Sequence, residues 1–185
     1  MSDEELRAVW KAAETAGVFG DLVRFILLTA TRRSEAAHMK RTELTGADWI
    51  IPAERYKSKI DHLIPLSAAA QSLIRKDGDL IFTLTGNFPI TGFSLFKDGL
   101  DKASGVTGYR LHDLRRTARS LMPRAGISED IAERCLGHVM AGVRGTYNRH
   151  QYQIEKSQAF EALASLIDRI VHPQDNVVPI KVANA

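Results

Sequence analysis

The sequence contains a single cysteine, Cys135, among its 185 residues. One cysteine excludes an intrachain disulfide and a cysteine-based zinc cluster, and it fits a reducing compartment. Long apolar runs are also missing, since the longest covers residues 25–28 and a membrane-spanning helix needs roughly 20 residues. The acidic, amphipathic residues 1–10 do not have the pattern of a secretory signal. The sequence therefore predicts a cytoplasmic protein without a membrane segment.

Two motifs that often mark enzymes are absent as well. There is no glycine-rich phosphate-binding loop, and no group of Asp and Glu residues has the spacing of metal ligands. We therefore expect no metal, no ATP and no other cofactor. The composition, with 44% hydrophobic and 25% charged residues, is that of a globular chain, and its length fits one domain with a short tail.

Positive charge is concentrated in two stretches. The formal net charge of the chain is +3. Residues 31–60 carry seven basic and four acidic side chains, which gives +3, and residues 107–150 carry eight and four, which gives +4. All eight basic residues of the second stretch are arginines, whose planar guanidinium suits two-point contacts to phosphate. Charge alone leaves open a basic face that is merely solvated.

Helical patterns predominate along the chain. Ser2 and Glu5 form a capping box at the start of a helix that should end near Gly17, and a second helix should run from Asp21 to Ala30. Shorter helices are expected after Ser34 and from residue 67 to about 75. In the second half, helices are predicted over residues 111–125, 128–137 and 152–171.

Strands are predicted in the middle of the chain. Residues 49–51 and 62–66 are rich in large and β-branched side chains and read as two strands joined by a loop over residues 54–61. Residues 80–82 form a further short extended piece. Within the helix over residues 111–125, we expect Leu111, Leu114 and Leu121 on the buried face, and His112, Arg115, Arg116 and Arg119 on the polar face. Pro123 should kink this helix or end it early.

Five short fragments could carry chemistry, although each alone has an ordinary structural explanation. In chain order they are a tight turn that presents Arg32 in Thr29–Glu35, the hairpin loop Tyr56-Lys57-Ser58-Lys59, the pair His112 and Arg115 in the first turn of a helix, Leu136-Gly137-His138, and Gly145-Thr146-Tyr147-Asn148-Arg149. A histidine and an arginine three residues apart at a helix N-terminus outline an anion site. The order and spacing of all five fragments are a much more specific signal of function than any single fragment.

Residues 4 to about 165 resemble the tyrosine recombinase (phage integrase) family. The resemblance implies that Arg32, Lys57, His112, Arg115, His138 and the nucleophile Tyr147 are catalytic, that Glu35 is a supporting carboxylate, and that DNA contacts come from Arg33, Lys59, Arg116 and Arg119. The family has glycine where this sequence has Ala30. Lys59 is the alternative to Lys57, and Tyr152 is the alternative to Tyr147.

The same residues suit phosphodiester chemistry in physical terms. Two guanidiniums, Arg32 and Arg115, can clamp the non-bridging oxygens on which negative charge grows, as metal ions do elsewhere. The phenol of Tyr147 can attack the phosphorus, Lys57 can protonate the departing 5′-oxygen, and either histidine can accept a proton or orient an oxygen. A covalent phosphotyrosine conserves the bond energy, so no ATP is required.

The resemblance implies an α+β fold that is mainly α-helical, a helical bundle with a small antiparallel β-sheet. It further implies a site-specific recombinase or integrase of a prophage or mobile element. The expected partners are double-stranded DNA at attachment sites, other copies of the chain in a tetramer, and host or phage accessory DNA-bending proteins. We expect residues 1–172 to be the catalytic domain, residues 173–185 to be a tail that docks on a neighbouring protomer, and the family's N-terminal core-binding domain to be absent. Two other functions stay open, an inactive DNA-binding relic and a relaxing enzyme of the type IB topoisomerase kind.

Overall fold

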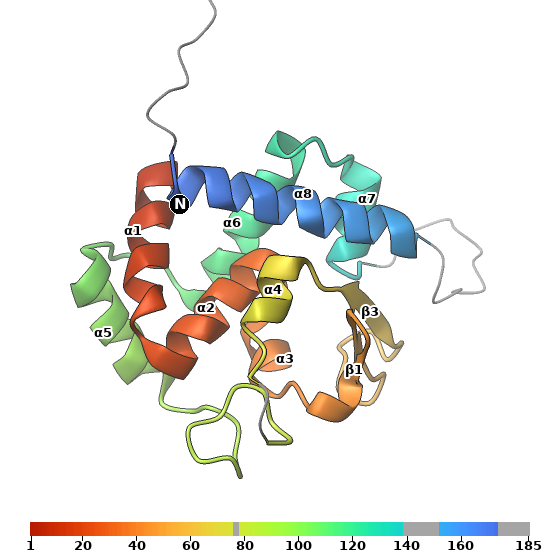
Figure 1. The fold of residues 1–185 in the computed structure, drawn as a ribbon, viewed down its shortest axis with the longest axis horizontal. Helices are drawn as coiled ribbons and strands as arrows, with labels where there is room; N and C mark the ends of the chain where they lie inside the picture. The colour runs from red at the N-terminus through yellow and green to blue at the C-terminus, as the bar shows by residue number, and fades with distance from the viewer. Residues whose placement is uncertain (76–77, 139–151, 174–185) are drawn as a thin grey trace, which may run out of the picture.

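A computed structural model of the chain describes residues 1–75, 78–138 and 152–173 (Figure 1). This part of the chain is mainly α-helical with one small antiparallel sheet, which confirms the expected fold class. In chain order the elements are α1 (Asp3–Glu14), α2 (Gly17–Thr29), α3 (Arg33–Ala37), the 3₁₀ turn η1 (Arg41–Glu43), β1 (Leu44–Thr45), β2 (Asp48–Ile51), β3 (His62–Pro65), α4 (Ala68–Ser72), α5 (Phe93–Ser104), α6 (Leu111–Arg124), α7 (Glu129–Cys135) and α8 (Gln153–Val171).

The first two helices pack closely against each other. The predicted capping box is present, with Ser2 Oγ accepting from the Glu5 N–H at 3.2 Å and the Glu5 carboxylate accepting from the Ser2 N–H at 2.8 Å. The second helix begins at Gly17 rather than near Asp21. Its first turn approaches α1 so closely that a Cβ on Gly20 would lie 1.8 Å from the carbonyl oxygen of Ala13. Glycine at position 20 lets α2 begin at Gly17. The spacing of apolar side chains gives no sign of this, because glycine has no side chain.

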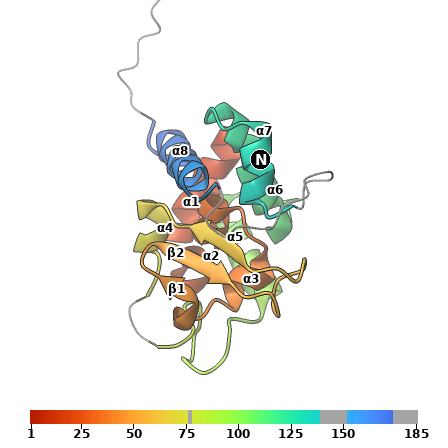
Figure 2. The same ribbon diagram turned by 90° about the vertical axis from the view of Figure 1, so that its right-hand side faces the viewer.

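The sheet has the order β1-β2-β3, with both pairs antiparallel. In the register of the two predicted strands, Trp49 pairs with Ile64 and Ile51 with His62. The strand β1 was not predicted, because two residues are too few to show an alternating pattern. Figure 2, which faces the sheet, shows it in front of α2 and α5 and below α7 and α8, and in Figure 1 it lies at the opposite end of the molecule from α1 and α5.

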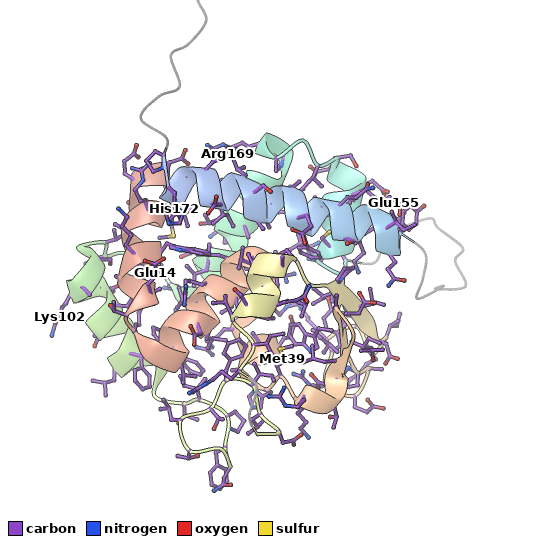
Figure 3. The ribbon with its side chains drawn as sticks, viewed as in Figure 1. Glu14, Met39, Lys102, Glu155, Arg169 and His172 are labelled. Atoms are coloured by element: carbon purple, nitrogen blue, oxygen red, sulfur yellow. The ribbon has the colours of Figure 1, made fainter. Side chains whose placement is uncertain are left out.

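The long helix α8 closes the core. It packs on α1, α6, α7 and β3, and in Figure 1 it runs across one edge of the molecule. Figure 3 places Met39 among the packed side chains of the interior and Lys102 and Glu155 on the rim, in agreement with the full burial of Met39. Of the helices that the structure describes, none combines the length and the apolarity that crossing a membrane requires.

Three helices in the second half of the chain agree with the prediction, and one, α5, was not expected. α7 begins at its cap Ser128, and α8 matches its predicted span within one residue. α6 contains Pro123 in its last turn and ends one residue later, at Arg124. The helix α5 is not predicted from the sequence, because its cap is Gly92 rather than a polar side chain, Gly99 lies in its interior, and only Leu100 of its residues is fully buried.

Candidate active site

Arg32 is positioned by the turn between α2 and α3. Ala30 ends α2 in the left-handed conformation, with φ 51°, at the position where the sequence resemblance expects glycine. Arg32 is then extended and caps α3. The carboxylate of Glu35 accepts from the Arg32 backbone N–H at 2.9 Å and from Arg32 Nη1 at 2.6 Å. Glu35 is buried, so this one carboxylate fixes both the turn and the guanidinium.

Arg115 lies inside the protein, and its expected place on the polar face of α6 is wrong. Its side chain is only 7% exposed, because Nη1 donates to the carbonyl oxygen of Ala30 at 2.5 Å and Nη2 to that of Leu136 at 3.1 Å. Burial lowers the pKa of Arg115, and the nearby positive charge of Arg32 lowers it further. Arg115 thus binds the carbonyl oxygen two residues before Arg32, the charges of the two guanidiniums repel each other, and both hydrogen bonds of Arg115 go to uncharged oxygens. An anion bound there would relieve their repulsion.

A hollow of about 310 Å³ opens beside Arg32, and we call it the Lys57 hollow. Its lining residues are Arg32, Tyr56, Lys57, Ser58, Gly137 and His138. Three of the residues predicted as catalytic therefore meet at one cavity, although they come from segments far apart in sequence. Lys57 lies in the loop between β2 and β3, six positions beyond the end of β2, and its side chain is exposed.

The two candidate lysines of this loop differ in their surroundings. Lys57 lines the hollow, whereas Lys59 has a left-handed backbone, with φ 56°, and its Nζ donates to the carbonyl oxygen of Glu54 at 3.3 Å. Lys59 thus bonds back onto its own loop. The geometry favours Lys57 for a role at the cavity.

A second hollow, of about 440 Å³, is also lined by Arg32, and we call it the His112 hollow. The residues that line it are Arg32, Arg33, Ser34, Phe93, Ser94, Lys97, Arg110, Leu111 and His112. His112 is exposed at the start of α6, and the guanidinium of Arg33 lies 4.4 Å from the centre of the Phe93 ring. Because Arg32 lines both hollows, the two form one basic surface centred on this residue.

His138 is hydrogen bonded to Glu133, a residue of α7. Its Nδ1 is hydrogen bonded to Glu133 Oε2, and its backbone N–H donates to the carbonyl oxygen of Glu133 at 3.0 Å. Burial acts to raise the pKa of Glu133, but the hydrogen bonds from His138 and Arg119 outweigh it, so the pKa is lowered and the carboxylate stays ionised. About half of the His138 side chain remains exposed.

The chain between α7 and His138 packs against the hairpin. The carbonyl oxygen of Leu136 accepts from the Tyr56 hydroxyl at 3.1 Å as well as from Arg115. The Tyr56 ring stacks on His62 with 4.7 Å between centroids, and His62 Nε2 is hydrogen bonded to the carbonyl oxygen of Cys135. Burial lowers the pKa of His62 well below its ordinary value, so this ring is neutral. These contacts fix the position from which His138 projects.

Replacing Gly137 by alanine should destabilise the protein by about 2–4 kcal/mol. Gly137 has φ 68°, which costs an alanine about 1 kcal/mol. A Cβ there would also lie 2.0 Å from the Tyr56 hydroxyl oxygen and 2.8 Å from His62 Cε1, an overpacking that costs a further 1–3 kcal/mol, roughly. Urea unfolding measures the difference. Gly126→Ala is the matched control, because Gly126 has φ 81° and open space around it. Equal losses in the two variants would contradict the contact with Tyr56.

The remaining arginines of the predicted DNA-binding set differ from one another. Arg116 is largely exposed and pairs with Asp113 at 3.2 Å. Arg119 is held in two ion pairs, with Glu129 and with Glu133, the latter at 2.9 Å from Nε to Oε1. Its guanidinium thus binds two carboxylates of the same protein. The position of Arg119 on the polar face of a predicted helix does not reveal these ion pairs.

Two predicted features fall outside the described residues. The proposed nucleophile Tyr147 lies within residues 139–151, and the tail lies within residues 174–185 apart from Pro173. Conversely, sequence reasoning missed Glu133, Arg110 and Lys97 near the site. Glu133 precedes His138 by five residues, across the end of α7, and Lys97 belongs to the unpredicted α5, so these two residues had no recognisable local pattern.

The described part of the site holds no cluster of metal ligands. Within residues 1–75, 78–138 and 152–173, His, Cys, Asp and Glu side chains form no group of three that could hold a metal ion. The positive charge beside the hollows comes instead from guanidinium and ammonium groups, and the imidazoles of His112 and His138 are among the lining residues.

Comparisons with known proteins agree with these features. Residues 1–154 match the sequence model of the phage integrase family. The prophage integrase IntZ of Escherichia coli (strain K12) is 30% identical over 186 residues, which cover 93% of this chain and 46% of IntZ. The chain therefore spans less than half the length of this relative.

Solved structures share the fold. The lambda integrase catalytic core is 22% identical, with a TM-score of 0.61, and the match covers 75% of this chain and 94% of that core. A lambda integrase tetramer bound to a Holliday junction is 20% identical, with a TM-score of 0.58, covering 76% of this chain and 47% of that one. At these identities the likeness shows the fold alone.

Proposed function

The chain belongs to the phage integrase family, and on that premise we propose that it cleaves and rejoins double-stranded DNA at specific sites through a 3′-phosphotyrosine intermediate. The proposed setting is a prophage or mobile element in the bacterial cytoplasm. The observation that carries the proposal is the position of Arg32. It lines both the Lys57 hollow and the His112 hollow, and it lies two residues after Ala30, whose carbonyl oxygen accepts from Arg115 Nη1.

The proposed reaction conserves atoms and charge. The Tyr147 oxygen forms a bond to the scissile phosphorus, the bond from phosphorus to the 5′-oxygen breaks, and the tyrosyl proton passes to a histidine. Lys57 donates a proton to the departing 5′-oxygen. Arg32 and Arg115 stabilise the charge that develops on the non-bridging oxygens. The reverse attack, by a 5′-hydroxyl of another strand, releases the tyrosine and completes strand exchange.

DNA would approach across the two hollows. Arg33 and Arg110 supply positive charge beside Arg32, and His112 lines the same hollow. Contacts of such groups to phosphates hold a duplex in place without reading its sequence. We propose that Arg33, Arg116 and Lys59 also contact the backbone, and that Arg119 serves chiefly inside the protein.

The same premise extends to assembly and domain organisation. We propose that residues 1–172 act as a catalytic domain, which the 94% coverage of the lambda integrase catalytic core supports. We also propose that the chain works as a tetramer on paired DNA sites and that residues 173–185 dock on a neighbouring protomer. The likeness to a lambda integrase tetramer bound to a Holliday junction supports the first of these two proposals.

A nicked suicide substrate tests the central proposal. After cleavage such a substrate loses a short fragment that carries the 5′-hydroxyl, so the covalent complex accumulates. We expect a protein–DNA adduct on a denaturing gel, without metal or ATP. Failure to form an adduct on attachment-site DNA would overturn the proposal in favour of an inactive DNA-binding protein. Relaxation of supercoiled DNA without sequence preference would instead favour a topoisomerase.

The proton donor can be identified with a modified leaving group. Lys57→Ala should slow cleavage on the order of 10²-fold, the lower end for a general acid, because the side chain is exposed and water can replace it in part. A substrate with sulfur at the 5′-bridging position should restore the rate, since a thiolate leaves without a proton. Lys59→Ala should keep the wild-type ratio of the two rates. Selective recovery in Lys59→Ala instead would transfer the role to that residue.

A further inference from the structure

A histidine at a phosphate needs a defined orientation of its ring. The two ring nitrogens differ in function, and the hydrogen bond at one of them determines which nitrogen carries a proton and where the other points. Within the Lys57 hollow, His138 is the lining residue that requires such control, because its side chain is half exposed and follows a glycine.

The structure supplies the control through Glu133. An ionised carboxylate can only accept hydrogen bonds, so the contact between Glu133 Oε2 and His138 Nδ1 requires the proton to be on Nδ1. The backbone N–H of His138 also donates to the Glu133 carbonyl oxygen, at 3.0 Å. The ring is thus held at its Nδ1 edge, and Nε2 is left for the hollow.

Glu133 is itself held in place. Its second oxygen, Oε1, accepts from Arg119 Nε at 2.9 Å, and Arg119 in turn pairs with Glu129 at the start of α7. Both oxygens of Glu133 therefore have partners, and a chain of contacts runs from α6 through α7 to His138. The lowered pKa of Glu133 agrees with a carboxylate that is ionised at neutral pH.

We propose that Glu133 is the positioning residue for His138, and that Arg119 holds Glu133 in register. The inference rests on the proposed function, since only DNA cleavage gives His138 a phosphate to act on. It also explains why Arg119 is engaged with two carboxylates on α7 instead of extending into solvent.

Glu133→Leu tests the proposal, because leucine is close in size and cannot accept a hydrogen bond. We expect cleavage of the suicide substrate to slow roughly 10- to 100-fold, by analogy with the loss of a partner that orients a metal-bound histidine. DNA affinity should stay at the wild-type value. Glu129→Leu is the matched control, since it removes the other carboxylate of Arg119 without touching His138, and it should cleave at the wild-type rate.

A double-mutant cycle separates positioning from general support of the fold. In a His138→Ala background, adding Glu133→Leu should have no further effect on cleavage, because the group that Glu133 orients is already gone. An equal loss in both backgrounds, or a wild-type rate in Glu133→Leu, would overturn the proposal. Arg119→Met should lower the cleavage rate and leave DNA affinity unchanged, whereas a phosphate contact would lower affinity and its salt dependence.

The protonation of the His138 ring can be measured directly, without any cleavage assay. ¹⁵N NMR of the His138 ring should show the proton of the neutral ring on Nδ1 in the wild type and in Glu129→Leu, and a shift toward Nε2 in Glu133→Leu. An unchanged tautomer in Glu133→Leu contradicts the contact. If the wild type forms no adduct but the tautomer shifts, the proposed function fails while the hydrogen bond from His138 to Glu133 stands.

Discussion

The Tyr147→Phe variant should form no covalent adduct with DNA while binding it with wild-type affinity. Phenylalanine removes only the hydroxyl, which is the atom that would bond to phosphorus, and it retains the ring. Because no other group on this side chain can attack, the expected loss is complete rather than partial. This is the largest effect that the proposed mechanism predicts for a single atom.

The other three tyrosines have surroundings that suit them less well for attack. The Tyr56 hydroxyl is buried and donates to the carbonyl oxygen of Leu136, and burial raises its pKa. Burial also raises the pKa of Tyr109, and Asp101 adds to this effect. Tyr152 caps α8 with its ring 3.8 Å from the guanidinium carbon of Arg134. This elimination supports Tyr147.

A denaturing gel with the nicked substrate provides the measurement, and filter binding or anisotropy provides the affinity. Tyr152→Phe is the control, because this tyrosine lies five residues further along and is the alternative nucleophile. It should form the adduct. An adduct that persists in Tyr147→Phe and disappears in Tyr152→Phe would reverse the assignment.

Arg115→Lys should reduce the cleavage rate roughly 10²–10³-fold, as removal of one donor to a developing oxyanion does. A lysine retains the charge but has a single ammonium group. It cannot span the carbonyl oxygens of Ala30 and Leu136 and also present a second nitrogen to a phosphate. The Leu136 carbonyl would keep the Tyr56 hydroxyl as a donor, but one of the two buried hydrogen bonds from residue 115 would be lost, so a loss of about 1–3 kcal/mol in the free energy of unfolding should accompany the kinetic defect.

Single-turnover cleavage and urea unfolding, measured on the same protein, test both parts. Arg124→Lys is the matched control on the same helix, because Arg124 is exposed and pairs with Asp3 at the surface. It should behave as the wild type in cleavage. Wild-type cleavage by Arg115→Lys would show that a simple positive charge suffices and that the two-point geometry of this guanidinium is not used.

Much of the local structure could be predicted because its causes lie close together in the chain. The capping box of Ser2 and Glu5 and the cap at Ser128 are contacts between residues three apart, and the apolar stripe of α8 repeats with the helical period. The family resemblance is confirmed, and it too depended on short fragments in a fixed order. The helix α5 escaped prediction because a glycine cap and an interior glycine weaken those same local signals.

The sequence by itself determined the class of fold, the family and the identity of the residues that could carry the chemistry. Only the tertiary structure decided how those residues are held. Arg115 is buried because it meets a carbonyl oxygen 85 positions away, Gly137 must lack a side chain because the Tyr56 hydroxyl lies where a Cβ would be, and Arg119 faces Glu133 from a different helix. Helix periodicity assigns a residue to a face, but the partner that makes burial of a charge favourable comes from a distant segment, and only folding brings the two together.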